Sequence, residues 1–248
     1  MRGVLVTGTD TGVGKTRVAV GLARGLRQRG VTVGVMKPVE TGHEAQEGWP
    51  QDAWSLREAA GIDDARELVV PYVFRTPAAP WVAARLEGRP VAFARLVEAA
   101  KTLAQRWPVL LVEGAGGLAV PIDARHNWAD LALALGLPLL VVAPNRLGTI
   151  NHTVLTVAYA RSRGVEVAGF VLNRLTDARD GTEDTNRAVI EALTGVPCWG
   201  EVDPLPPDGD AGRFLLWAAI LHRLDPAVAG EGEGEAGPKN LRRRDSGS

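Results

Sequence analysis

Cysteine and lysine are scarce in this chain of 248 residues: Cys198 is the one cysteine, and lysine occurs only at Lys15, Lys37, Lys101 and Lys239. A single cysteine excludes an internal disulfide and a metal site built from several cysteines. The formal net charge is only −1, so we expect neither nucleic acid nor an anionic membrane as a partner. No apolar run is long enough to span a bilayer, and the apolar start shows no signal-peptide pattern. We therefore expect a cytoplasmic protein.

The composition suits a single α/β domain. With 46% hydrophobic residues, a chain of this length can bury one large core. Apolar runs without alternation are separated by helix-like segments, which indicates a mainly parallel sheet with helices on both faces, a three-layer sandwich. The predicted strands are Val4–Thr7, Thr32–Met36, Val109–Glu113, Leu139–Ala143 and Glu166–Leu172, with a further short strand at Cys198.

The helix-like segments alternate with these strands, and the last of them is followed by a change in composition. Residues 225–248 carry almost no large apolar residue, so we expect a single domain over residues 1–224 and a disordered tail after it. The predicted helices are Thr16–Arg29, Ala53–Ala60, Ala92–Arg106, Trp128–Leu135, Ile150–Arg163, Glu183–Leu193 and Ala211–Arg223.

The most informative segment is Gly8-Thr9-Asp10-Thr11-Gly12-Val13-Gly14-Lys15-Thr16, between the first predicted strand and the first predicted helix. A strand, a glycine-rich loop, Gly-Lys-Thr and a helix are typical of a phosphate-loop NTPase. The glycines let backbone N–H groups surround phosphate oxygens, and the helix N-terminus adds its positive dipole end. Lys15 would reach the terminal phosphates, and the Thr16 hydroxyl would bind Mg²⁺. Five residues, not four, separate Gly8 from Gly14. The alternative is an ordinary glycine turn; we predict a nucleotide site.

A second lysine follows the second predicted strand, in Met36-Lys37-Pro38-Val39-Glu40-Thr41-Gly42. The carboxyl ends of parallel strands meet at one edge of the sheet, which is where ligands bind in such folds. Lys37 is therefore expected near the phosphate loop, where it suits chemistry that builds negative charge at the γ-phosphate. Its alternative role is that of a solvated lysine closing a strand.

The third predicted strand ends in Glu113-Gly114-Ala115-Gly116-Gly117. A carboxylate at a strand end is typical of the second metal-holding element of phosphate-loop proteins. Because Mg²⁺ prefers oxygen ligands and keeps several waters, Glu113 would bind it directly or through water. Asp52 could supply another oxygen, although by itself it is equally a good residue for a helix N-terminus.

Two further segments end or begin elements at the same predicted edge. Gly148-Thr149-Ile150-Asn151 opens a helix whose free N–H groups could bind a carboxylate or phosphate, or could simply be capped. Asn173 ends another strand and could contact a base edge. The following Arg174 does not give the Asn-Lys-x-Asp pattern of guanine-binding proteins, which disfavours a GTPase.

Together these motifs resemble the dethiobiotin synthetase family, and the resemblance extends to about residue 222. It rests on Gly8–Thr16, Lys37-Pro38-Val39 with Thr41-Gly42, Val112–Gly117, Gly148 with Ile150-Asn151-His152, and Gly200-Glu201 before a proline-rich loop. The five-residue spacing of the phosphate loop is also what this family looks like. The resemblance implies ATP-dependent closure of a ureido ring from 7,8-diaminopelargonate and CO₂, in biotin biosynthesis.

The resemblance also implies roles for individual residues. Lys15 and Lys37 would be catalytic, stabilising carbamate and phosphoryl charge, and Thr16, Asp52 and Glu113 would hold Mg²⁺. The implied nucleotide-binding residues are Gly12, Val13, Gly14, Lys15, Thr16, Arg17, Asp52, Glu113, Gly114, Ala115, Gly116, Asn173, Arg174, Asp203, Pro204 and Leu205. The implied substrate-binding residues are Thr11, Lys37, Thr41, Gly116, Gly117, Gly148, Thr149, Ile150 and Asn151.

The family is dimeric, so the helix start at Gly148–Asn151 would hold the substrate carboxylate of the opposite subunit. Two positions depart from the family: Gly12 and Arg174 stand where acidic residues can occur in relatives.

Two other functions remain as alternatives. A partition or assembly ATPase would carry a lysine early in the phosphate loop, where this chain has Thr9-Asp10-Thr11. An amide ligase of the cobalamin pathway would need a glutamine-hydrolysing cysteine, and Cys198 has no obvious histidine partner.

Overall fold

The computed structural model describes residues 1–43, 48–206 and 209–224. The predicted tail, residues 225–248, lies outside the described residues. The main sheet has the strand order β2-β5-β1-β6-β7-β8, and every neighbouring pair is parallel. These strands are β1 (Gly3–Gly8), β2 (Val33–Met36), β5 (Val109–Gly117), β6 (Leu139–Pro144), β7 (Val167–Asn173) and β8 (Cys198–Val202). The predicted parallel sheet is confirmed, including the short strand at Cys198.

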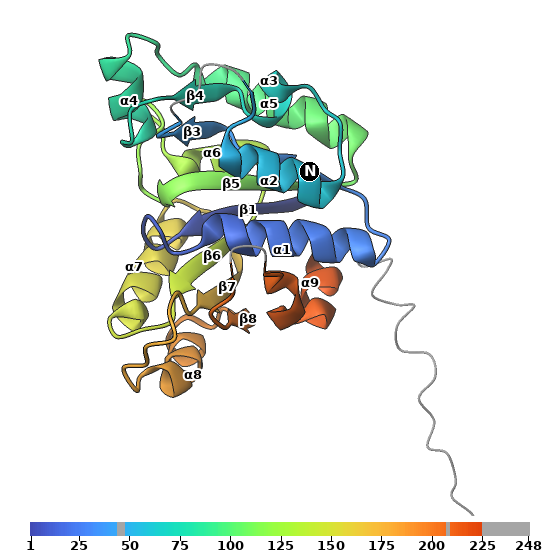
Figure 1. The fold of residues 1–248 in the computed structure, drawn as a ribbon. Coiled ribbons are helices and arrows are strands. Elements are labelled where there is room, and N and C mark those ends of the chain that lie inside the picture. The colour runs from blue at the N-terminus through green and yellow to red at the C-terminus, as the bar shows by residue number, and fades with distance from the viewer. Residues whose placement is uncertain (44–47, 207–208, 225–248) are drawn as a thin grey trace, which may run out of the picture.

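Helices cover both faces of this sheet, so the expected three-layer α/β sandwich is confirmed (Figure 1). Alternate residues of β1 enter different cores: Val4 and Val6 pack with α1, α2 and α9, whereas Leu5 packs with α5 and α6. A third cluster joins β6 and β7 to α7 and α8. The helices are α1 (Lys15–Gln28), α2 (Gln51–Ala60), α3 (Arg66–Val69), α4 (Pro80–Leu86), α5 (Phe93–Arg106), α6 (Trp128–Leu135), α7 (Thr149–Ser162), α8 (Glu183–Thr194) and α9 (Trp217–Leu224).

A small second sheet was not predicted. Its strands β3 (Val39–Thr41) and β4 (Tyr72–Phe74) pair in parallel and lie beside α4 in Figure 1. Each has only three residues, too few to show a periodicity in the sequence. The short helices α3 and α4 were missed for the same reason. This sheet matters for the site because β3 begins just after Lys37.

The last predicted helix, Ala211–Arg223, is wrong as a single element. The chain forms a 3₁₀ turn, η1 (Ala211–Phe214), and then α9. Between them Leu215 bridges to Gly200 of β8, and the backbone N–H of Leu216 donates to the Trp199 carbonyl at 2.7 Å. These sheet-like contacts hold the backbone extended at Leu215, so the helix is interrupted there.

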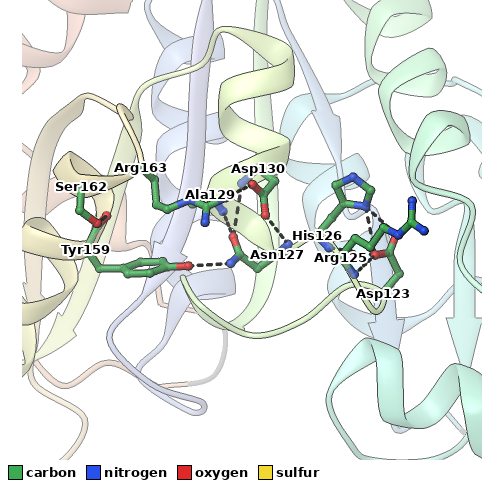
Figure 2. A network of polar contacts seen from close by, with 9 residues as sticks. All are labelled: Asp123, Arg125, His126, Asn127, Ala129, Asp130, Tyr159, Ser162 and Arg163. Atoms are coloured by element: carbon green, nitrogen blue, oxygen red, sulfur yellow. Dashed lines mark hydrogen bonds and ion pairs between the residues drawn. The ribbon is translucent and has the colours of Figure 1, made fainter.

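The segment between β5 and α6 is held by the polar network drawn in Figure 2. Asn127 caps α6 in a capping box with Asp130, and its side-chain N–H donates to the Tyr159 hydroxyl of α7 at 2.7 Å. Arg163, directly after the end of α7, forms an ion pair with Asp130. Through these contacts α6 and α7 hold each other in place. They also hold the end of the loop between β5 and α6.

Candidate active site

The phosphate loop joins β1 to α1 at the carboxyl edge of the sheet. Gly12 and Gly14 have φ angles of 75° and 90°, in the left-handed region that glycine adopts without strain. The Lys15 ammonium donates to the carbonyl oxygen of Asp10 at 3.0 Å, across the loop. Burial lowers the pKa of Lys15. The loop therefore curves around its own lysine, and the free N–H groups of the first turn of α1 lie beside it.

Gly14 is also required by a close approach from β7. The side-chain N–H of Asn173 donates to the Val13 carbonyl at 2.9 Å. A Cβ on Gly14 would lie 2.0 Å from Asn173 Nδ2, a distance no real side chain tolerates. The Asn173 Oδ1 is buried and, within the part of the chain that the structure describes, lacks a partner. Asn173 thus supports the loop directly while its carbonyl oxygen is left for another donor.

Lys37 lies at the centre of a charged cluster and is only 3% exposed. Its ammonium is 2.7 Å from Asp52 Oδ2 and 2.5 Å from Glu113 Oε1. The Thr16 hydroxyl donates to the same Glu113 oxygen at 2.7 Å. Burial alone would lower the pKa of Lys37, but the charges of Glu113 and Asp52 raise it above its ordinary value. The structure thus brings together side chains from α1, α2, the end of β2 and β5 that lie far apart in the sequence.

The donor set of this cluster fits a magnesium ion. Glu113 is 1% exposed, and within the described ranges its Oε2 is buried without a hydrogen-bond partner. Nowhere in those ranges do three or more His, Cys, Asp or Glu side chains gather as a metal cluster. Two carboxylates and one hydroxyl suit Mg²⁺, which keeps several waters and takes phosphate oxygens as further ligands. Thr16, Asp52 and Glu113 are therefore the residues that could hold it.

Glu40 was not predicted, yet it orients the cluster. Its two carboxylate oxygens accept the backbone N–H groups of Asp52 and Ala53, each at 3.0 Å. The helix α2 has Pro50 at its N-cap and no side-chain cap of its own, so Glu40 of β3 takes the place of an N-cap residue. Burial raises the pKa of Glu40. Asp52 is thereby held in position by a residue from another element.

These residues surround a pocket of about 320 Å³, here called the catalytic pocket. It joins the phosphate loop to the small sheet and to the end of β5. Of the predicted site residues, those that line it are Thr11, Gly12, Gly14, Lys15, Thr16, Lys37, Thr41, Asp52, Glu113, Ala115 and Gly116, and Glu40 lines it as well.

Other predicted residues lie close by without lining the catalytic pocket. Gly117 lines an adjoining groove of about 480 Å³ together with Asp10, Thr11 and Tyr159. Arg17 lines a hollow beside α1. Val13 is buried. Gly114 packs against Trp128: a Cβ placed on Gly114 would lie 3.1 Å from the Trp128 ring. The absence of a side chain at Gly114 therefore lets α6 pack closely against β5.

The predicted base-binding segments contact each other. Arg174 forms an ion pair with Asp203 at 2.6 Å, and its backbone N–H donates to the Val202 carbonyl. Leu205 packs against the core beside α1, and Pro204 precedes it. Gly148, Thr149, Ile150 and Asn151 begin α7 as expected, but they line neither the catalytic pocket nor the adjoining groove.

The sequence is similar to known proteins over most of its length. A model of the AAA domain family matches residues 2–210. The ATP-dependent dethiobiotin synthetase BioD of Anaeromyxobacter dehalogenans strain 2CP-C is 54% identical over 194 residues, which cover 78% of this chain and 86% of that protein. The protein of the same name from Bacillus licheniformis is 44% identical over 229 residues, 92% of this chain and 95% of its own. This chain belongs to the dethiobiotin synthetase family. It is an ATP-dependent ligase of biotin biosynthesis. The membership in this family that its sequence motifs indicated is confirmed.

Solved structures resemble this dethiobiotin synthetase family member in fold alone. A ParA family ATPase from Chlorobium tepidum TLS is 15% identical with a TM-score of 0.50, and covers 95% of both chains. A chain of the MinC:MinD complex of Aquifex aeolicus is 13% identical with a TM-score of 0.51, over 99% of this chain and 100% of that one. None of the helices in the described ranges has the length and apolar character needed to cross a membrane.

Proposed function

We propose that this ligase closes the ureido ring of dethiobiotin from 7,8-diaminopelargonate, CO₂ and ATP. One substrate amine adds to CO₂ and loses a proton, which gives a carbamate. A carbamate oxygen attacks the γ-phosphorus of ATP, and the bond to the ADP oxygen breaks. The second amine then attacks the carbonyl carbon of this carbamic–phosphoric mixed anhydride. Phosphate leaves, the proton of the amine is lost, and the ring closes.

The observation that carries the proposal is the meeting of two ammonium groups and two carboxylates in one pocket. Lys37 touches Asp52 and Glu113, and Lys15 lines the same space. Negative charge develops on the carbamate and on the transferring phosphoryl group, and a preorganised donor to such charge contributes about 3–4 kcal/mol. The scheme needs no nucleophilic side chain, because positioning and charge stabilisation suffice for phosphoryl transfer.

Thr16, Asp52 and Glu113 would hold Mg²⁺, which when bound neutralises charge on the phosphate oxygens. The orphaned Glu113 Oε2 supports this assignment. The side chains of Lys37 and Thr16 meanwhile orient the Glu113 carboxylate through its other oxygen, Oε1.

The remaining predicted residues divide between nucleotide and substrate. The loop from Gly12 to Arg17 and residues Gly114–Gly116 would contact the phosphates, whereas Asn173, Arg174 and Asp203–Leu205 would surround adenine. Thr11, Thr41 and Gly116–Gly117 would contact the diamine. Gly148–Asn151 lies outside the catalytic pocket of its own chain. We therefore propose a homodimer in which this segment binds the carboxylate of the substrate in the opposite subunit. We also propose that the enzyme is cytoplasmic.

The proposal is tested by incubating the protein with MgATP, bicarbonate and 7,8-diaminopelargonate and measuring ADP and dethiobiotin. Equal amounts of the two products are expected, and both should require the diamine. ATP turnover that is indifferent to the diamine would instead favour a nucleotide-switched partition ATPase. The amide-ligase alternative finds no support at Cys198, because burial raises the pKa of its thiol to about 11 and its S–H contacts the Gly200 carbonyl.

A further inference from the structure

A second pocket lies beside the small sheet and shares no lining residue with the catalytic pocket. Its volume is about 310 Å³. Four arginines from α3, the end of β4, the loop after α4 and the start of α5 line it, with two glutamates and an apolar wall that includes Phe74. We call it the arginine pocket, and its cationic side chains are Arg66, Arg75, Arg89 and Arg95.

Two of these guanidinium groups are held in place by one aromatic ring. Arg89 Cζ lies 5.5 Å and Arg95 Cζ lies 5.2 Å from the centroid of Tyr72. Tyr72 is itself fixed, since it is buried and its hydroxyl accepts the backbone N–H of Ala92 at 3.0 Å. Contact with a ring face leaves the in-plane N–H donors of a guanidinium available. The ring therefore orients two cations without neutralising them, and one Arg89 N–H also makes a long contact of 3.5 Å with the Val73 carbonyl oxygen.

The carboxylates nearby compensate these cations only in part: the hydrogen bond from Thr76 and, more weakly, the charge of Arg75 hold the pKa of Glu87 below its ordinary value. Within residues 1–43, 48–206 and 209–224, none of the four arginines takes part in an ion pair. Glu87 accepts the backbone N–H of Thr76 at 2.8 Å instead. Four arginines against two glutamates leave the pocket cationic, although the chain as a whole is slightly acidic.

Within the part of the chain that the structure describes, one unpartnered N–H donor and one unpartnered histidine nitrogen lie in this pocket. Among the described residues, Arg66 Nε and His43 Nε2 are buried and have no hydrogen-bond partner, and both residues line this pocket. A buried donor without an acceptor costs about 1–3 kcal/mol, so such groups are normally satisfied by protein, water or a ligand. Planar guanidinium groups match the oxygens of phosphates and carboxylates with two parallel hydrogen bonds.

We propose that the arginine pocket binds a compact dianion whose phosphate or carboxylate oxygens accept hydrogen bonds from Arg66 and from the stacked guanidinium groups of Arg89 and Arg95. The excess positive charge sets the charge of the ligand, and the volume of the pocket sets its size. This site is separate from the catalytic pocket, although both touch the strand β3 and its continuation, at Thr41 and at His43.

The test is calorimetric titration of the full chain with inorganic phosphate and, separately, with malonate. A saturating non-hydrolysable ATP analogue with Mg²⁺ occupies the phosphate loop throughout. We expect one site with a Kd at or below about 1 mM for at least one anion, and the tighter of the two identifies the phosphate or the carboxylate source. Arg66→Gln should weaken this binding about tenfold, because a charge-assisted donor is lost.

Arg213→Gln is the matched control, because it removes the same charge from an exposed residue of η1; it should leave anion binding unchanged. Thermal melting shows whether Arg66→Gln folds, and Arg95→Gln is the second variant if it does not. Absence of binding of both anions to the unsubstituted protein overturns the proposal. So does equal affinity of the unsubstituted protein and the pocket variants.

Discussion

The two cationic regions of this ligase are built in opposite ways. In the catalytic pocket, Lys37 is almost fully buried and lies between the carboxylates of Asp52 and Glu113. In the arginine pocket, Arg89 and Arg95 are exposed, stack on Tyr72 and have no ion pair in the described part of the chain. A buried charge must be compensated inside the protein, whereas water compensates an exposed one. In the catalytic pocket the positive charge is therefore held in one position by neighbouring carboxylates. In the arginine pocket the positive charge is in excess and is available to bind an anion.

The largest effect is expected from removing Lys37, the cation that Asp52 and Glu113 compensate. Lys37→Ala should lower kcat by a factor of about 10² to 10³, since a preorganised donor to developing charge is lost, and the KM for ATP should change much less. Steady-state kinetics measures both. Lys101→Ala, on the exposed surface of α5, is the matched control. Unchanged turnover of a folded Lys37→Ala protein would remove Lys37 from the mechanism.

The next largest effect is expected at Glu113, the carboxylate that we propose as a Mg²⁺ ligand. Glu113→Gln keeps the size of the side chain but removes its charge, so the Mg²⁺ concentration for half-maximal activity should rise about tenfold or more. A Mg²⁺ titration of initial rates measures this. Glu98→Gln, on α5 and outside the catalytic pocket, serves as the control. A titration curve identical to that of the unsubstituted protein would show that Glu113 is not a ligand.

A smaller effect is expected from Glu40, which caps α2 from outside the helix. Glu40→Ala should reduce the free energy of unfolding by about 1 kcal/mol, the usual contribution of a lost N-cap, and should also raise the Mg²⁺ requirement because Asp52 loses its support. Glu40→Gln retains one carbonyl acceptor and should recover part of both. Denaturant unfolding together with Mg²⁺ titration separates the two effects. Loss of stability without any change in the Mg²⁺ requirement would limit Glu40 to a structural role.

The smallest effect on catalysis is expected in the other region. Arg66→Gln should leave kcat within about twofold, because sites without shared partners act independently, while it weakens anion binding. Measuring rate and binding on the same preparation sharpens the contrast between the regions. A large drop in kcat would mean that the two pockets are coupled through β3.

The central part of the catalytic pocket was predictable because it depends on strand ends. Lys37 and Glu113 each follow an apolar run, and parallel strands place their carboxyl ends at one edge. Glu40 could not be found this way, since its role depends on how β3 meets the start of α2, which no local pattern encodes. The break at Leu215 likewise depends on a bridge to Gly200. Local periodicity favours one helix there, and the distant strand overrides it.

The arginine pocket escaped prediction for a related reason. Its cations come from four separate segments, and single exposed arginines are ordinary on a protein surface. Only the common ring of Tyr72 reveals that two of them act together. Such a site becomes visible when side chains are placed in space.

The approach of Asn173 to the phosphate loop limits what evolution or engineering can do at position 14. Two independent obstacles oppose any larger residue there: the left-handed backbone and the amide that occupies the space of a Cβ. Shortening Asn173 would remove the second obstacle and leave the first, while it also takes away the donor to Val13. Replacing both residues together therefore leaves the backbone strain at position 14 in place, so a change at Asn173 alone does not make this position tolerant.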